Sequence, residues 1–202
     1  MNVLVVYCHP VAASLMGAVK SQVVEALNGA GHEVLVSDLY AEGFSATLSG
    51  EEWLDYEQGQ HRSASTARHI DQLLAAEALV LLYPTWWYSM PALLKGYFDR
   101  VWLPNVAFGL TPDGSVALHM LGRMRRMIVV TSYGAPWPFI RFFMGDPGRR
   151  LICRGLKRLM APGAHITWCA LYGVDRASPA RVADFKARAM RAVAGLGRVE
   201  PA

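Results

Sequence analysis

Two short segments of the sequence carry residue types that could do chemistry at the point where an apolar run ends. The first is the segment from Cys8 to Ser14, which precedes a helical pattern that Ser14 is suited to cap. Unpaired N–H groups at the start of that helix, together with the Ser14 hydroxyl and the His9 imidazole, would suit a phosphate group. The residues leave a second interpretation open, in which Ser14 only caps its helix and His9 packs locally.

The second segment, Pro84 to Pro91, contains three consecutive aromatic residues, Trp86, Trp87 and Tyr88. Side chains alternate in direction along extended backbone, so three aromatics in a row cannot all enter the core. Loop aromatics and backbone donors between two prolines can line and hold a flat heteroaromatic ring. The alternative is that these residues form a dimer contact or fill the core.

Apolar strands that alternate with amphipathic helices must position these two segments. The sequence predicts strands over 3–7, 33–38, 78–83, 127–131 and 165–171. It predicts helices over about 14–28, 66–76, 91–102, 147–160 and 179–194. This alternation predicts an α/β fold, a doubly wound five-stranded parallel sheet with helices on both faces. Ligands bind such sheets beyond the carboxyl ends of the strands, which singles out the loops 8–14, 84–90 and 132–146.

The remaining segments are expected to belong to the same single domain, 1–202. Residues 39–65 are predicted to be loop-like and include an acidic cluster with Glu51 and Glu52. The sequence Pro112-Asp113-Gly114 predicts a turn, and therefore a hairpin within an excursion over about 103–121.

Composition and charge exclude several classes of protein. A chain of 202 residues with 53% hydrophobic residues is neither a disordered segment nor a repeat array. The longest apolar candidate, residues 75–88, contains Glu77 and Pro84 and is too short to span a membrane. The second half holds 15 Lys/Arg against 5 Asp/Glu, but they are scattered through apolar helical patterns, so nucleic acid is not an expected partner. A cytoplasmic protein is expected.

Several common catalytic motifs are absent from the sequence. No GxGxxG follows the first strand, and no GxxxxGK(S/T), GxSxG or HExxH occurs. The three cysteines have no CxxC spacing, so neither a disulfide framework nor a metal site is expected. Cys8 is interpreted as a small buried hydrophobe rather than a reactive thiol. With these classes excluded, a doubly wound sheet of this size favours a bound flavin.

The segment YPTWWYSMPALLKGYFDRV (Tyr83 to Val101) resembles the signature of the flavodoxin-like NAD(P)H:quinone oxidoreductase family. The segments YCHPVAASL (Tyr7 to Leu15) and SDLYAEGFSATLS (Ser37 to Ser49) are similar to two further marks of that family, in the same order and spacing. The resemblance covers essentially the whole chain and is clearest over 1–108. It implies a flavodoxin-like fold and a homodimer with one FAD or FMN per subunit. It also implies that NAD(P)H donates a hydride and that a quinone-like acceptor is reduced by two electrons in a ping-pong cycle.

The resemblance also implies roles for individual residues. The loop with His9 would surround the flavin phosphates and ribityl chain, and the loop after Pro84 would line the isoalloxazine ring. Residues 131–134 would present backbone donors to that ring, while Phe108 and Trp87 would form part of the substrate pocket. The implied flavin-binding residues are His9, Ser14, Leu15, Met16, Pro84, Thr85, Trp86, Trp87, Tyr88, Thr131, Ser132, Tyr133 and Gly134.

Three positions depart from the family pattern. Met16 replaces the usual Asn near the phosphates, and Tyr133 replaces the first glycine of the loop 131–134. Met144 stands where the best-known quinone reductases have a His, so a proton relay of that kind is not expected. Tyr133 is the candidate catalytic residue, because it or Arg141 could assist protonation, although either could equally be structural.

Aromatic residues crowd loops that are expected at one edge of the sheet. Their apolar area is larger than a monomer normally exposes, which favours a two-fold interface between two copies with shared flavin sites. These residues are Trp86, Trp87, Phe108, Trp137, Phe142 and Phe143.

Two other functions are left open by the sequence. Some proteins that resemble this family regulate membrane potassium-efflux systems, and the basic second half could dock onto such a partner. A flavodoxin-type electron carrier is the other alternative, although the pI near 9.1 and the His9-Pro10 loop speak against it. The sequence does not distinguish FAD from FMN or NADH from NADPH, and it does not identify the acceptor.

Overall fold

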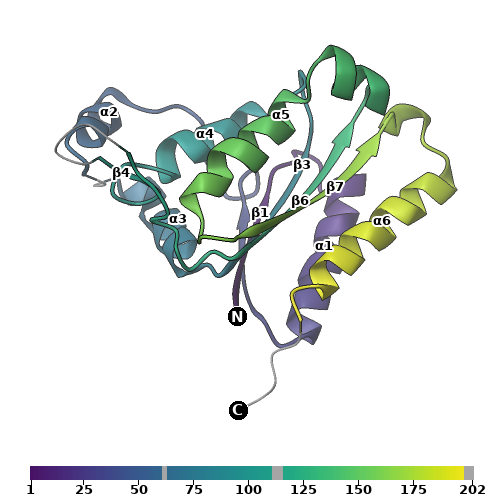
Figure 1. The fold of residues 1–202 in the computed structure, drawn as a ribbon, viewed down its shortest axis with the longest axis horizontal. Coiled ribbons are helices and arrows are strands. Elements are labelled where there is room, and N and C mark those ends of the chain that lie inside the picture. Colours follow the sequence, from purple (N-terminus) through teal and green to yellow (C-terminus); the bar gives the residue numbers. More distant parts are fainter. Residues whose placement is uncertain (61–62, 111–115, 198–202) are drawn as a thin grey trace.

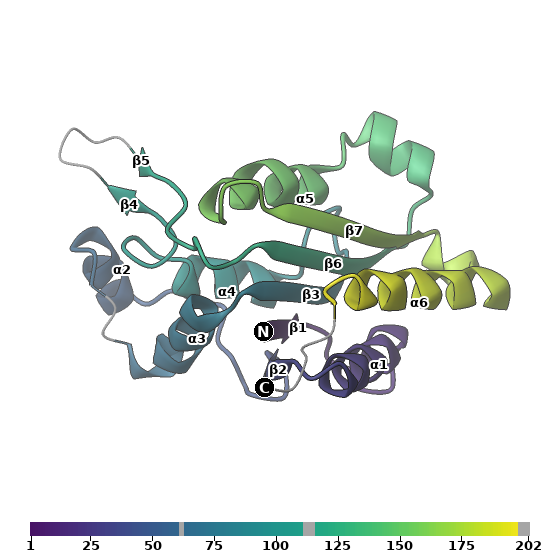
Figure 2. The same ribbon diagram turned by 60° about the horizontal axis from the view of Figure 1, so that its bottom comes forward.

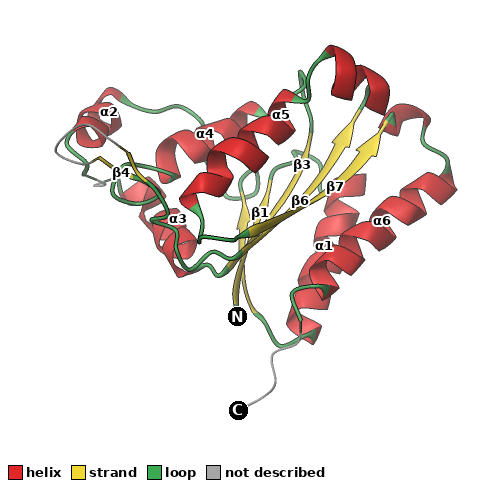
Figure 3. Ribbon diagram, viewed as in Figure 1, coloured by secondary structure: helices red, strands yellow, loops and turns green. Residues whose placement is uncertain are grey.

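The computed structural model of the chain describes residues 1–60, 63–110 and 116–197. Its centre is a five-stranded sheet in which every neighbouring pair of strands is parallel, with the order β2-β1-β3-β6-β7 (Figures 1 and 3). The strands are β1 (Asn2–Tyr7), β2 (Glu33–Asp38), β3 (Ala78–Pro84), β6 (Arg126–Tyr133) and β7 (His165–Tyr172). The expected α/β fold with a doubly wound parallel sheet is confirmed.

Helices cover both faces of this sheet (Figure 2). On one face lie α1 (Leu15–Gly29) and α6 (Pro179–Ala194), and on the other lie α3 (Ala64–Ala75), α4 (Ala92–Val101) and α5 (Pro147–Arg150). Strand β1 divides its side chains between the two cores, since Leu4 and Val6 face one cluster while Val3 and Val5 face the other. All four are fully buried. A central strand of a parallel sheet is apolar throughout because neither face meets water.

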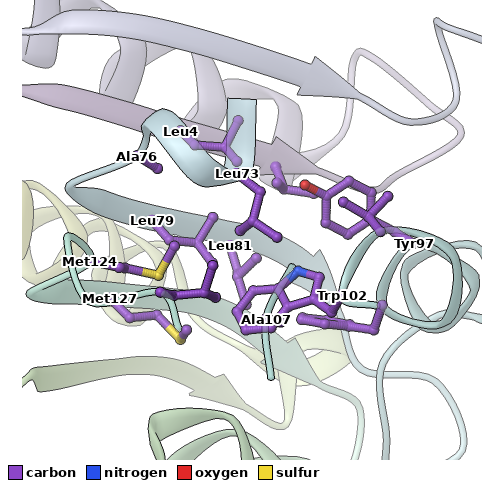
Figure 4. Packing of buried hydrophobic residues seen from close by; sticks show 14 of the residues in the cluster. Leu4, Leu73, Ala76, Leu79, Leu81, Tyr97, Trp102, Ala107, Met124 and Met127 are labelled. Atoms are coloured by element: carbon purple, nitrogen blue, oxygen red, sulfur yellow. The ribbon is translucent and has the colours of Figure 1, made fainter. Parts of the chain in front are cut away.

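The core on the α3 and α4 side draws side chains from many elements. Figure 4 shows Leu4 of β1, Leu73 of α3, Leu79 of β3 and Tyr97 of α4 converging with Met127 of β6. Each of these side chains is at most 1% exposed. This packing holds the sheet rigid beneath the loops that follow its strands.

The segment 39–65 is not the loop that the sequence predicted, because it contains α2 (Gly50–Glu57). Ser49 and Glu52 form a capping box: the Glu52 amide donates to Ser49 Oγ at 3.1 Å, and the Ser49 amide donates to Glu52 Oε2 at 3.0 Å. None of the α2 residues is fully buried, and the helix has only eight residues, too few for an apolar period to stand out in the sequence. The capping box was its sequence signal.

One further expectation needs correction, and another agrees with the structure. The helix predicted over 147–160 is regular only in α5, and it continues as a π-helical turn over 151–155 and a 3-10 turn over 156–159. The excursion does contain a short antiparallel pair, β4 (Gly109–Leu110) and β5 (Val116–Ala117). The predicted turn at Pro112-Asp113-Gly114 lies outside the described residues.

Candidate functional site

The three loops singled out by the sequence follow β1, β3 and β6, which are adjacent in the sheet. Backbone bonds tie the first residues of two of these loops to the neighbouring strand. The Cys8 amide donates to the Leu82 carbonyl at 2.9 Å, and the Thr85 amide donates to the Ser132 carbonyl at 2.7 Å. Because parallel strands end at one edge, the loops converge there, at the upper side of the sheet in Figure 1.

The loop 8–14 ends at the N-terminus of α1, where Ser14 is the cap. Its hydroxyl accepts from the Gly17 amide at 3.1 Å, as the sequence predicted. The amides of Leu15 and Met16 have no acceptor among the residues that the structure describes. His9 Nδ1 lies 3.0 Å from both the amide nitrogen and the carbonyl oxygen of Val11, which leaves Nε2 as the ring nitrogen for a ligand. This arrangement could hold an anion.

Gly17 is required by the close approach of this loop to the helix. A Cβ at Gly17 would lie 1.9 Å from the Ala12 carbonyl oxygen and 3.2 Å from the Tyr7 hydroxyl. Such distances are far inside van der Waals contact. The glycine therefore allows the loop to fold over the first turn of α1, beside the unpaired amides.

The aromatic segment after β3 forms a tight turn. Trp86 and Ser89 exchange two backbone bonds, with the Trp86 amide donating at 3.0 Å and the Ser89 amide donating at 3.1 Å. The two central residues have positive φ, 49° at Trp87 and 64° at Tyr88. Two positive φ values define a type I′ turn, which normally takes Asn and Gly.

Left-handed backbone at two bulky aromatics stores strain. A non-glycine residue in this region costs on the order of 1–2 kcal/mol, and such residues cluster at ligand sites. Burial of the Trp87 side chain does not offset this strain, since Trp87 is 93% exposed. The prediction that the three aromatics do not all enter the core is confirmed, and the strain points to a ligand-binding role for the turn.

The end of β6 differs from the loop that the resemblance implied over 131–134. Strand β6 continues through Tyr133 and pairs with both β3 and β7, so Thr131 and Ser132 are buried ladder residues. Thr131 Oγ1 lies 3.0 Å from Thr85 Oγ1 and braces the start of the aromatic loop. Amides within a central strand are used by its neighbours, so donors for a ligand begin only at Gly134.

Tyr133 does not present its phenol to a ligand. The ring is 2% exposed and stacks on Tyr172 with centroids 4.7 Å apart, and its hydroxyl donates to Asp146 Oδ1 at 3.2 Å. Burial, reinforced by the Asp146 carboxylate, raises the pKa of Tyr133 far above its ordinary value. A buried phenol whose proton is held by a carboxylate is a poor proton donor, so the expected catalytic role of Tyr133 is not supported by its surroundings.

A cavity of about 240 Å³ opens between the turn and the end of β6. It lies where the ring-binding residues of the resemblance converge. Its lining residues are Thr85, Trp87, Tyr88, Tyr133, Gly134, Ala135 and Ile140.

The first 145 residues match the model of a protein family described by a flavodoxin-like fold. The chain belongs to the flavodoxin-like fold family. It is 33% identical over 125 residues to the human ribosyldihydronicotinamide dehydrogenase (quinone), a match that covers 54% of each protein. The chain spans about half the length of the curated relatives it matches.

Two solved structures show the same likeness over nearly the whole chain. The NAD(P)H:quinone oxidoreductase from Methanothermobacter marburgensis has a TM-score of 0.77 at 25% identity, covering 99% of this chain and 98% of that one. Smu.1420 from Streptococcus mutans UA159 has a TM-score of 0.83 at 26% identity, covering 96% and 100%. These matches confirm the flavodoxin-like fold that the sequence segments indicated, and one of these similar proteins is a quinone oxidoreductase.

The site of this flavodoxin-like chain suits the flavin that its family implies. The unpaired amides of Leu15 and Met16 and His9 Nε2 supply donors for a phosphate. The turn with Trp87 and the backbone from Gly134 surround a cavity on the same edge of the sheet. Among the described residues, the Met16 amide remains a free donor, so the absence of the usual Asn side chain leaves the helix N-terminus intact.

One other expected participant lies away from the cavity. Phe108 is half-buried against the core on the α4 side and is not among the residues around the cavity within one chain. Cys8 is fully buried, and this burial raises the pKa of its thiol to about 12, in agreement with its interpretation as a small hydrophobe. Asp146 was not among the residues that the sequence singled out, because its contact with Tyr133 spans 13 positions and has no local signal.

Proposed function

We propose that the chain is a flavin-dependent NAD(P)H:quinone oxidoreductase. The observation that supports this best is the strained turn of Trp86 to Ser89 beside a cavity, on the same edge as an α1 N-terminus with unpaired amides. A bound flavin supplies two-electron chemistry there, taking a hydride from NAD(P)H and reducing a quinone in a ping-pong cycle. The proposal covers FMN and FAD alike, because both share the ring and the first phosphate.

The residues of the chain would bind, orient and shield. The amides of Leu15 and Met16, with Ser14 and His9, would hold the phosphate end. Pro84, Thr85 and the aromatic turn would line the ring, while Gly134 would offer backbone donors toward its polar edge. The backbone bond between Thr85 and Ser132 and the hydroxyl contact between Thr85 and Thr131 fix the base of the cavity.

Flavin content and turnover test the proposal directly. We expect the purified protein to bind flavin and to oxidise NAD(P)H only when a quinone such as menadione is added. Absorbance of the bound flavin, its mass after release, and steady-state oxidation at 340 nm are the measurements. A protein that binds flavin without turnover is a carrier or a regulatory subunit, and one that binds no flavin refutes the proposal altogether.

Two substitutions at Trp87 distinguish the effect of backbone strain on stability from the effect of the indole on turnover. Trp87→Ala removes the exposed indole and keeps the left-handed backbone, so we expect unchanged stability within about 0.5 kcal/mol. Trp87→Gly also relieves the positive φ and should raise the free energy of unfolding by about 1 kcal/mol. Both variants should turn over quinone more slowly at saturating flavin, because the wall of the cavity is lost.

Urea unfolding of flavin-free protein, read beside turnover, measures the two effects. Equal stability of the two Trp87 variants would show that the turn stores no strain. Unchanged turnover in both would remove Trp87 from the substrate pocket.

The exposed aromatics beside the site support a homodimer. Phe142 and Phe143 are 75% and 77% exposed, and they already pack in pairs, with Trp137 against Phe142 and Phe139 against Phe143. A second copy would cover this apolar surface. We expect light scattering of the flavin-loaded protein to give the mass of a dimer, and Phe142→Ser/Phe143→Ser to give the mass of a monomer. A monomeric wild-type protein with flavin bound would contradict the shared site.

The proposal places the protein in the cytoplasm. Its cysteines, Cys8, Cys153 and Cys169, are all free thiols, which suits a reducing compartment. Over the described ranges, every helix is too short or too polar to cross a membrane. Labelling of all three thiols in denatured protein taken directly from cell extract would test this placement.

A further inference from the structure

A second cavity, of about 420 Å³, lies beside the proposed ring site and is strongly basic. Four guanidinium groups and a single carboxylate surround it. Its lining residues are Arg141, Gly145, Asp146, Arg149, Arg150, Cys153 and Arg154. We call it the arginine cavity.

The positive charge of the arginine cavity is not neutralised by its neighbours. In the described part of the chain, no carboxylate lies within 4.0 Å of any of the four guanidiniums. The carboxylate of Asp146 accepts a hydrogen bond from Tyr133. Four like charges around one hollow repel each other, and a multiply charged anion relieves that repulsion. Guanidinium forks match the oxygens of a phosphate in particular.

Neighbouring residues and one hydrogen bond connect the arginine cavity to the proposed ring site. Ile140 lines the ring-side cavity, and the next residue, Arg141, lines the arginine cavity. A Cβ at Gly148 would lie 3.5 Å from the Tyr88 carbonyl oxygen, so Arg149 follows a residue that touches the aromatic turn. Asp146 joins the two sites through Tyr133. A ligand in the ring-side cavity therefore has the arginine cavity within its surroundings.

We propose that the arginine cavity binds the 2′-phosphate of the reduced dinucleotide, so that NADPH is preferred to NADH as the hydride donor. This inference rests on the proposed oxidoreductase function. The two dinucleotides differ only in a phosphomonoester on the adenosine ribose, and arginine is the residue type that accommodates that group in dinucleotide sites. The basic cavity supplies the charge that distinguishes them.

Calorimetric titration of the flavin-loaded protein tests the inference without turnover. The probes are adenosine 2′,5′-bisphosphate, adenosine 5′-monophosphate and inorganic phosphate. We expect the bisphosphate to bind at least about tenfold more tightly than the monophosphate, and Arg149→Ala/Arg150→Ala to abolish that difference. Arg123→Ala, an exposed arginine outside the cavity, is the matched control and should retain it.

The ratio of kcat/KM for NADPH and NADH is the second measurement. It should fall toward one in the double variant, with quinone reduction by NADH retained. Turnover with equal use of both dinucleotides in the wild-type protein overturns this inference and leaves the oxidoreductase proposal standing. Absence of turnover with either dinucleotide overturns the oxidoreductase proposal. Inorganic phosphate binding with no advantage for the bisphosphate shows an anion site unrelated to NADPH, and it also overturns the inference.

Discussion

Replacing Gly17 with alanine should abolish tight flavin binding. The added Cβ would stand 1.9 Å from the Ala12 carbonyl oxygen, so the loop 8–14 must move away from the first turn of α1. That movement displaces His9 and disturbs the cap at Ser14, whose hydroxyl bonds to the Gly17 amide. Losing two charge-assisted bonds to a phosphate, each of about 1.5–3 kcal/mol, lowers the affinity for flavin by more than about a hundredfold.

Two other variants serve as comparisons for Gly17→Ala. Gly29→Ala makes the same change at the other end of α1, where a Cβ meets no atom within 4 Å, and flavin affinity should not change. His9→Ala removes one donor and leaves the helix N-terminus in place, so its loss should be smaller, about ten- to a hundredfold. Fluorescence titration with flavin measures all three affinities. A Gly17→Ala protein that binds flavin as the wild type does would place the phosphate elsewhere.

Replacing Arg100 with alanine should destabilise the fold more than replacing an exposed residue such as Trp87. Arg100 lies on α4 with a side chain only 7% exposed, and it donates to the carboxylate of Glu52 as well as to Ser45 O and Ser65 Oγ. It therefore ties α2 and the segment before it to the body of the domain. Removing Arg100 leaves the partly exposed Glu52 carboxylate without its guanidinium donor, which costs at least about 1.5–3 kcal/mol.

The ion pair of Arg100 and Glu52 should make the stability of the protein depend on pH in the acid range. Burial by itself raises the pKa of Glu52, but hydrogen bonds from Arg100 and Ser49 outweigh it and hold the pKa below its ordinary value. A carboxyl with a lowered folded-state pKa stabilises the protein above its unfolded pKa, about 4.3, and loses that contribution as pH falls through the folded value. The gap in stability between wild type and Arg100→Ala should therefore narrow as the pH falls below about 4.

Urea unfolding at neutral and acid pH measures both effects. Lys95→Ala is the matched control, because it breaks an exposed pair with Asp99 on the same helix and should cost less than about 1 kcal/mol. A gap that stays constant with pH would mean that Glu52 does not titrate with the pair.

The regular part of the fold was accessible from local sequence pattern. Strands buried on both faces must be continuously apolar, so runs such as Val3 to Tyr7 identify themselves without any tertiary information. The start of the helix after Ser14 could also be predicted from the sequence, because its cap is a local hydrogen bond. Helix α2 was missed because it has only eight residues, fewer than the stretch over which a helical period becomes evident.

The sequence predicted which residues belong to the candidate site, but it did not predict their geometry. The resemblance carried by Tyr83 to Val101 singled out the aromatic turn, and the alternation of side chains showed that not all three aromatics could be core residues. The residue types of Trp87 and Tyr88 do not predict a positive φ, because aromatic residues rarely adopt it. The two backbone bonds between Trp86 and Ser89 impose that conformation as the chain passes from β3 to α4.

By itself, the sequence determined the succession of the five long strands and most of the helices along the chain, the fold family, and the two segments that we propose bind a flavin. These follow from hydrophobic periodicity, caps and a motif, each of which is set within a few neighbouring residues. Only the tertiary structure decided that Tyr133 is held by Asp146 and Tyr172, and that four arginines from 141–154 surround one cavity. The physical reason is that such partners are joined by packing between β6, β7 and the irregular turns around α5, and contacts of that kind leave no pattern along the chain.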